Sequence, residues 1–323
     1  MKKIFVIGII MLLVLTMVGC DDNTSTVVTT RAFLGGEMGL DAQFEKSLPP
    51  DEILDEGQQS FAIALKLENI GEADVLEGEG YVEIKGISPE NFDKSSQEDL
   101  KKEFSDDLRK AKKSSDSNRI EGGISYIDFP DLKFLPDISG DQEISFQADV
   151  CYDYMTTSTA LVCIKKEGRL DVDKGICNDN EEKEVQNSGS PIHITKLVQS
   201  PAGRGKTRFA FTISHVGDPL LDSFFKKDTN CDDEVSNSDR YKILFKVPTE
   251  INGKKFECTT LEGSDADESE GFITLYDKKE RSVQCTLDVS NADASFPTSI
   301  TVELEYRYLQ RLDRTSVIKD VSD

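Results

Sequence analysis

The sequence contains no tryptophan and only two histidines, His193 and His215. Histidine is the side chain that most often serves acid–base and metal chemistry near neutral pH, so its scarcity removes much of that chemistry. Each histidine lies in a stretch with strand-like alternation, and neither has a recognisable cysteine or serine partner nearby. We predict ordinary structural roles for both, with His193 facing solvent beside Thr195.

Catalytic and metal-binding motifs are also missing. The sequence has no GxSxG, P-loop, HExxH or GxGxxG motif in a strand–helix context, and no CxxC pair for zinc or redox chemistry. Two acidic loops, 228–239 and 263–271, lack EF-hand spacing, so we expect solvated hairpin loops, with calcium binding through their carboxylates as the alternative. We therefore predict no catalytic residue, no bound metal and no cofactor. A pocket holding a histidine or converging carboxylates would favour an enzyme instead.

Positive charge is scarce relative to negative charge. The chain has 38 basic and 61 acidic residues, a net charge of −23, which becomes −25 without residues 1–20 and their two lysines. Such a surface repels the phosphates of nucleic acids and anionic lipid headgroups. We exclude nucleic acid as a partner and expect the charge to provide solubility, with binding of cations or basic partners as the alternative.

The N-terminus has the layout of a secretion signal. Two lysines precede the uncharged stretch 4–19, which is shorter than the roughly 20 residues of a membrane span. The stretch ends in Met17-Val18-Gly19-Cys20, which resembles the lipobox of prokaryotic lipoproteins, although leucine is usual at the position of Met17. The resemblance implies cleavage before Cys20, lipidation of Cys20 and an extracytoplasmic protein anchored in the membrane by lipid. An uncleaved N-terminal helix is the alternative.

Composition divides the rest of the chain. Residues 21–32 are rich in threonine and serine, which is typical of an extended tether, and residues 178–191 are charged and rich in turn formers. The predicted division is a signal peptide (1–19), a tether (20–32), a first domain (33–177), a linker (178–190), a second domain (191–310) and a C-terminal tail (311–323).

A long internal repeat indicates that the two domains are copies. Residues 60–75 resemble 208–221, and residues 143–154 resemble 299–310, in the same order and at offsets of about 148 and 156 residues read from the sequence. Apolar and polar residues alternate in these segments, as in half-buried strands. The second copy contains seven such stretches separated by turn signals, a pattern similar to an immunoglobulin-like sandwich. The predicted fold class is all-β, with two tandem immunoglobulin-like β-sandwiches.

One helix is expected inside the first copy, over residues 95–115. Ser95 and Glu98 have the spacing of a capping box, and Leu100, Phe104 and Leu108 fall on one helical face. A charged, partly ordered segment is the alternative.

Six cysteines remain after Cys20 is set aside, and an even number in an exported chain favours three disulfides. Cys151 and Cys163 are equidistant from Thr157, the centre of an expected hairpin turn, so we pair them. Cys163 with Cys177 is a competing pair.

The other pairs follow from strand faces and from what is left. Cys258 and Cys285 each share a face with apolar residues of the second copy and are therefore paired. Cys177 and Cys231 remain, both flanked by asparagine and aspartate, and their pairing would link the two copies.

The chain as a whole resembles bacterial and archaeal surface lipoproteins with tandem immunoglobulin-like domains. The resemblance implies a lipid-anchored protein of the cell envelope, and because no catalytic motif is present we predict a non-enzymatic structural or adhesion module. Its partners would be the membrane, through the lipid on Cys20, and a protein at the cell surface. The alternative is a ligand-binding or accessory lipoprotein of a membrane complex, with a concave apolar site between the copies.

Overall fold

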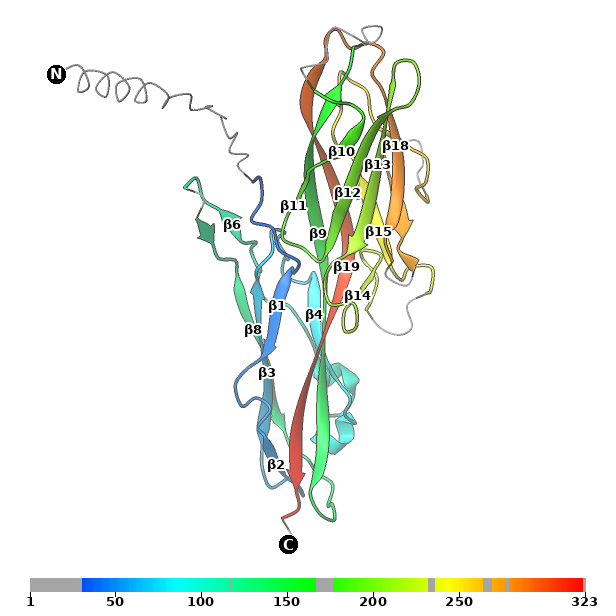
Figure 1. The fold of residues 1–323 in the computed structure, drawn as a ribbon. Helices are drawn as coiled ribbons and strands as arrows, with labels where there is room; N and C mark the ends of the chain where they lie inside the picture. Colours follow the sequence, from blue (N-terminus) through cyan, green and yellow to red (C-terminus); the bar gives the residue numbers. More distant parts are fainter. Residues whose placement is uncertain are drawn as a thin grey trace, which may run out of the picture. The chain divides into compact units, whose positions relative to one another are not determined.

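The computed structural model describes residues 31–116, 118–166, 177–231, 236–263, 269–276 and 279–321 (Figure 1). Residues 32–323 form one compact unit. The described residues are all-β, with two short 3-10 helices, Pro89–Phe92 (η1) and Gln97–Leu100 (η2), and no helix of seven or more residues. The predicted signal peptide and Cys20 lie outside the described residues.

The strands of the first copy run from Leu40 to Ile164 along the chain. They are β1 (Leu40–Phe44), β2 (Glu52–Leu54), β3 (Phe61–Asn69), β4 (Gly80–Lys85), β5 (Lys101–Glu103), β6 (Lys112–Lys113), β7 (Arg119–Ile120), β8 (Ile124–Leu132) and β9 (Gln142–Ile164).

The strands of the second copy run from Glu181 to Lys319 along the chain. They are β10 (Glu181–Lys183), β11 (Val185–Asn187), β12 (Ile192–Pro201), β13 (Lys206–His215), β14 (Ser223–Phe225), β15 (Lys242–Lys246), β16 (Glu257–Cys258), β17 (Glu270–Thr274), β18 (Arg281–Asp288) and β19 (Phe296–Lys319). The two strands β10 and β11 occupy the segment predicted as a linker, and β19 continues into the predicted tail as far as Lys319.

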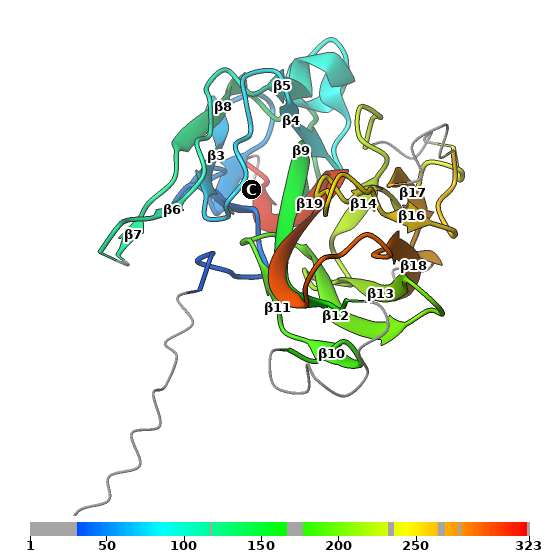
Figure 2. The ribbon, with the colours of Figure 1, turned by 90° about the horizontal axis from the view of Figure 1, so that it is seen from above.

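Three sheets share one hydrophobic core. A three-stranded sheet has the order β1-β3-β8, a five-stranded sheet has the order β10-β12-β13-β18-β16, and a nine-stranded sheet is built on β17-β15-β19-β9-β4-β5. The main core cluster contains buried side chains from all three sheets. Seen from above, β9 and β19 lie between β3 and β8 on one side and β12, β13 and β18 on the other (Figure 2).

The strands β9 and β19 pair antiparallel over the whole length of β9, from Gln142 opposite Ile318 to Ile164 opposite Phe296. The prediction of two strands joined by a hairpin turn at Thr157 is therefore wrong. Residues 156–159 read Thr-Thr-Ser-Thr, and β-branched threonine favours strands, whereas tight hairpin turns favour glycine, asparagine or aspartate.

The two copies have equivalent strand orders. In the first copy, β1-β3-β8 faces β4-β9; in the second, β12-β13-β18 faces β15-β19. Tyr152 and Tyr308, which are equivalent in the sequence repeat, lie directly opposite each other in the β9–β19 pairing. The copies are thus related by an approximate twofold rotation about this pair. Each long strand runs from its own copy into the other, so the copies share one sheet.

The segment predicted as a helix is extended over most of its length. Only η2 is helical, and its N-cap is Ser96, with Asp99 completing the capping box one residue later than predicted. Leu100, Phe104 and Leu108 are buried, as a shared face requires. Their spacing of four residues fits the strand period of two as well as a helical turn, and backbone bonds from Phe104 to Gly80 and from Leu108 to Val75 select the extended form.

Candidate functional site

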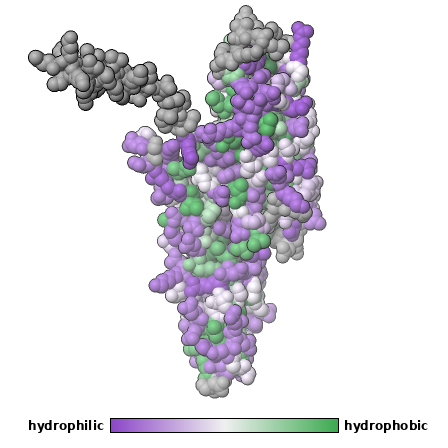
Figure 3. Space-filling view, viewed as in Figure 1, coloured by the Kyte–Doolittle hydropathy of each residue, from purple (hydrophilic) through white to green (hydrophobic). Residues whose placement is uncertain are grey.

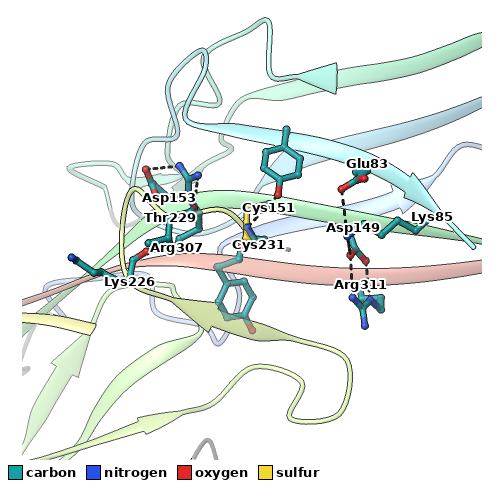
Figure 4. The surroundings of a disulfide bond; sticks show 12 residues. Glu83, Lys85, Asp149, Cys151, Asp153, Lys226, Thr229, Cys231, Arg307 and Arg311 are labelled. Atoms are coloured by element: carbon teal, nitrogen blue, oxygen red, sulfur yellow. Dashed lines mark hydrogen bonds and ion pairs between the residues drawn. A yellow bond between two sulfur atoms is a disulfide. The ribbon is translucent and has the colours of Figure 1, made fainter. Parts of the chain in front are cut away.

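The first candidate region is the face of the shared sheet that points away from the main core. Because successive side chains of a strand point to opposite faces, the odd-numbered residues of β9 lie here. Cys151 stands in a cross-strand row between Tyr81 of β4 and Leu309 of β19, and it forms a disulfide with Cys231 (Figure 4). The Cys231 amide donates a hydrogen bond of 3.2 Å to the Tyr81 hydroxyl. These residues and Phe225 form a small second core.

Ion pairs flank this disulfide on both sides along the strands. Arg311 donates two hydrogen bonds, of 2.8 and 3.0 Å, to the carboxylate of Asp149, and the Lys85 ammonium lies 3.2 Å from the same carboxylate. On the other side Arg307 binds Asp153 through two hydrogen bonds of 2.8 and 2.9 Å and donates a third to the Thr229 carbonyl (Figure 4). The pairs fix the strand register and the loop that carries Cys231.

Asp149 is the most enclosed of these charges, with 1% of its surface exposed. Burial by itself would raise the pKa of its carboxyl, but the hydrogen bonds and charge of Arg311 and the charge of Lys85 outweigh burial and hold the pKa below its usual value. The residue is therefore ionised at neutral pH and serves as a structural anion.

The disulfides differ from the predicted set in two of three pairs. The structure contains Cys258–Cys285, the pair that strand faces predicted, together with Cys151–Cys231 and Cys163–Cys177. Cys151 and Cys163 cannot pair because they lie on one continuous strand, 12 positions apart in its sequence. The competing pair Cys163–Cys177 is the one present. The link between copies is made by Cys151, not Cys177.

A row of buried tyrosines marks the junction of the two copies. The Tyr154 hydroxyl lies 3.3 Å from Asn69 Oδ1, and a Cβ added at Gly71 would lie 2.1 Å from that hydroxyl. In the second copy, the Tyr308 hydroxyl lies 2.8 Å from His215 Nε2, and a Cβ at Gly217 would lie 2.3 Å from it. Glycine is required at both positions because the tyrosine hydroxyl touches the backbone there.

His215 belongs to this junction and not to a surface site. The Tyr308 hydroxyl donates a hydrogen bond of 2.7 Å to Asp222, so its oxygen is available to accept a proton from His215 Nε2. Burial, with the charge of Asp222, raises the pKa of the Tyr308 phenol well above its usual value, which keeps it protonated. The triad orients the loop after β13.

The second candidate region is an open groove of about 840 Å³ between the sheet of β1-β3-β8 and the sheet of β12-β13. The segment before β1, the residue after β3, β7, β12 and the loop after β13 line it. The lining residues are Gly35, Gly36, Glu37, Met38, Ile70, Arg119, His193, Val216, Gly217, Asp218 and Pro219. Ile70 and Val216 precede the equivalent glycines of the two copies, so the groove spans the junction.

The walls of the groove are held by hydrogen bonds from backbone amides to two side-chain carboxylates. The carboxylate of Glu72 accepts the amide protons of Leu34, Gly35 and Gly189, which joins the N-terminal segment to both copies. On the other wall, the Asp218 carboxylate accepts the amide protons of Leu220 and Leu221.

His193 lines this groove and is half-buried, not solvent-facing as predicted. Burial lowers the pKa of its imidazole, against smaller raising effects of the Gly36 backbone and the Glu37 charge. Its Nε2 atom is buried and has no hydrogen-bond partner in the described structure. Among the described lining residues there is no serine, threonine or cysteine side chain that the imidazole could activate.

Four exposed apolar side chains lie on the segments that form the groove or next to its lining residues. They are Met38, Ile120, Leu220 and Leu221, with exposures of 40%, 51%, 89% and 46%. The face shown in Figure 3 is mainly hydrophilic, and hydrophobic residues gather over its middle part. The sequence analysis missed this site because its segments are far apart in the chain. The only signal was the expectation of a concave site between copies.

Within the described residues, no group of three or more histidine, cysteine, aspartate or glutamate side chains could hold a metal ion, and both acidic loops considered for calcium lie partly outside that portion of the chain. No helix in the described part is both long and apolar enough to cross a membrane.

No protein family and no curated protein matches the sequence. Among solved structures, the chain is weakly similar to the serine-rich repeat adhesion glycoprotein Srr1 of Streptococcus agalactiae, with 9% identity over 84% of this chain and 87% of that chain and a TM-score of 0.18. A likeness at that level carries no argument. The fold is all-β. Its three disulfides are typical of proteins in oxidising, extracytoplasmic compartments, where disulfides form and persist.

Proposed function

We propose that the chain is a non-enzymatic, lipid-anchored protein of the cell envelope that acts as a rigid interaction module. The observation that carries this proposal is the β9–β19 ribbon, in which every residue of β9 has a partner on β19. Because each strand belongs to both copies, the copies cannot move independently without breaking this pairing.

The disulfide between Cys151 and Cys231 adds to the rigidity of the ribbon. It closes a segment of 80 residues, and long closed loops restrict the unfolded chain most in the entropic account of disulfide stabilisation. A scaffold of this kind suits the display of surfaces to partners. Enzymes that enclose a substrate more often need a lid or hinge.

The membrane part of the proposal rests on the sequence. Residues 4–19 and the Met17-Val18-Gly19-Cys20 motif resemble a lipoprotein signal, and three disulfides fit an exported chain. Cys20 would carry the lipid, and the segment up to Ala32 would be the tether. The Ala32 amide donates to Gln186 Oε1, so the fold begins there.

The intact mass of the protein extracted from membranes tests the anchor. We expect a chain that lacks residues 1–19, carries a diacylglyceryl group and gains six hydrogens on reduction of three disulfides. The variant Cys20→Ser should lack the diacylglyceryl group and the cleavage before residue 20 while its disulfides stay intact. Retention of residues 1–19 in the parent chain, or a parent mass without the diacylglyceryl group, would refute lipid anchoring.

Binding of a small ligand is the alternative that one observation favours. The groove of about 840 Å³ contains an imidazole nitrogen without a partner at His193 and a guanidinium at Arg119. A receptor for a small ligand would show a large rise in thermal stability with that ligand, and His193→Ala would remove the rise. The open form of the groove and its exposed apolar rim favour a macromolecular partner instead.

A further inference from the structure

We propose that the groove between the two copies is a docking site for an extended segment of a partner protein, with apolar side chains flanked by lysine or arginine. This proposal rests on the proposed interaction function and names the chemistry of its partner. The segment would lay apolar side chains against Met38, Val216 and Pro219, and its basic residues would face Glu37 and Asp218.

The apolar part of the argument comes from the distribution of exposed hydrophobic side chains. Met38 is in the lining, Ile120 follows the lining residue Arg119, and Leu220 and Leu221 follow Pro219. Isolated exposed apolar residues are normal on a protein surface, but several around one concavity are typical of an interaction site. Leu220 is the most exposed of the large hydrophobic residues in the described structure.

The charge of the groove selects a basic partner. Arg119 is the cation of the lining, and its guanidinium forms an ion pair of 2.7 Å with Glu121, which offsets its charge. The lining carries two carboxylates, Glu37 and Asp218, against this one guanidinium, within a chain of net charge −23. A second copy of this chain would bring the same charge to the interface, so repulsion disfavours self-association.

The shape of the groove is preorganised, which lowers the entropic cost of docking. Glu72 fixes the segment of Leu34 and Gly35 on one wall, and the Tyr308–Asp222 hydrogen bond fixes the loop after β13 on the other. Both walls are attached to the shared ribbon. A bound segment would therefore contact both copies at once.

Fluorescence anisotropy with three labelled synthetic peptides tests the proposal on the mature full-length chain. The peptides have one length and differ in composition: leucine and valine with lysine, leucine and valine with glutamate, and serine with lysine. We expect the first to bind best and to weaken with added salt. Met38→Ser in the lining and Leu220→Ser at the rim, next to the lining residue Pro219, should each weaken it by about tenfold. Leu161→Ser, at an exposed apolar position of β9 that neither lines the groove nor follows a lining residue, is the matched control.

Each outcome of the experiment decides the question. Selective binding of the apolar basic peptide, lost in Leu220→Ser and kept in Leu161→Ser, supports the proposal. Equal binding of the serine–lysine peptide would mean attraction by net charge alone, and preference for the acidic peptide or no binding would overturn the proposal. Concentration-dependent dimers in sedimentation that Leu220→Ser dissociates would assign the groove to a second copy. None of these results depends on Cys20, so failure here is distinct from failure of the lipid anchor.

Discussion

At the scale of single residues, the shared sheet depends on charges that are buried in pairs. Asp149 accepts two hydrogen bonds from Arg311 and lies beside Lys85, and these cations hold the pKa of its carboxyl below the usual value. A group with a lowered folded-state pKa stabilises the fold above its unfolded pKa, which is about 3.9 for aspartate. That contribution is lost as the pH falls through the folded-state pKa.

We therefore predict that Asp149→Asn lowers the free energy of unfolding at pH 7 by about 1.5–3 kcal/mol, the range for a hydrogen bond to a charged group. The variant should also lose less stability than the parent chain between pH 5 and the acid limit, since it has no carboxylate to protonate at this position. Urea unfolding at a series of pH values measures both effects.

Asp141→Asn is the matched control for this prediction. Asp141 forms an exposed ion pair with Lys319 near the end of the ribbon, and exposed pairs contribute little to stability. Equal losses in the two variants would show that the burial of Asp149 is unimportant.

The residue scale is also where prediction from sequence was weakest. Alternation placed Cys258 and Cys285 on a buried face, and the two do pair across adjacent strands. The same alternation predicts that Cys151 lies on one face of a strand. Its partner Cys231 comes from a loop 80 residues away, and no local pattern encodes that approach. The alternation that pairs His193 with Thr195 predicts a solvent-facing side chain, and it could not show the groove because the groove walls come from distant segments.

At the scale of elements, the sequence predicts where strands lie but not that β9 continues without a break. The alternating segments 60–75 and 208–221 contain β3 and most of β13. Alternation failed at β9 because Thr156 and Ser158 interrupt the apolar series. These two side chains are nevertheless buried, since Thr156 bonds to Tyr306 and to the Ile192 carbonyl, and Ser158 bonds to Asn187. Polar residues with buried partners resemble a turn in sequence.

Substitution of Thr157 by proline tests whether residue 157 lies in a strand or in a turn. The Thr157 amide donates to Ser188 Oγ, and its carbonyl accepts the Ser188 amide proton, so Thr157→Pro would leave Ser188 without a donor. We expect this variant to lower the free energy of unfolding by about 1–3 kcal/mol, the cost of an unsatisfied buried group. Thr157→Val keeps strand propensity and should change stability less. If urea unfolding finds the two variants equally stable, the hairpin interpretation is correct.

At the scale of the whole molecule, the sequence predicts the internal repeat but not how the two copies combine. Two matching segments at similar offsets indicated a duplication, and the equivalent strand orders agree with that. Periodicity gives the strands of each copy but not the strand across which the copies meet. The pairing of β9 with β19 has sequence separations of about 150 residues at its centre, where Tyr154 lies opposite Tyr306. Such contacts are absent from any local pattern.

Strand sharing predicts that the two copies unfold together. In a chain of independent tandem domains, β3 and β13 would lose amide protection in separate transitions. Here both copies depend on the β9–β19 ribbon, so hydrogen exchange of the most protected amides in β3 and in β13 should report one common free energy of opening.

Two fragments sharpen this prediction. Residues 191–310, the predicted second domain, lack the part of β9 that pairs with the first half of β19, and they also lack β11. The edge of β19 that pairs with β9 in the full chain then has no partner for its backbone groups. We expect no cooperative urea transition from this fragment. Residues 150–310 restore that part of β9 together with Cys151, and should recover a cooperative transition and the Cys151–Cys231 disulfide. Cooperative folding of 191–310 alone would show that the copies are autonomous, and the rigid coupling on which the proposed interaction module depends would then be absent.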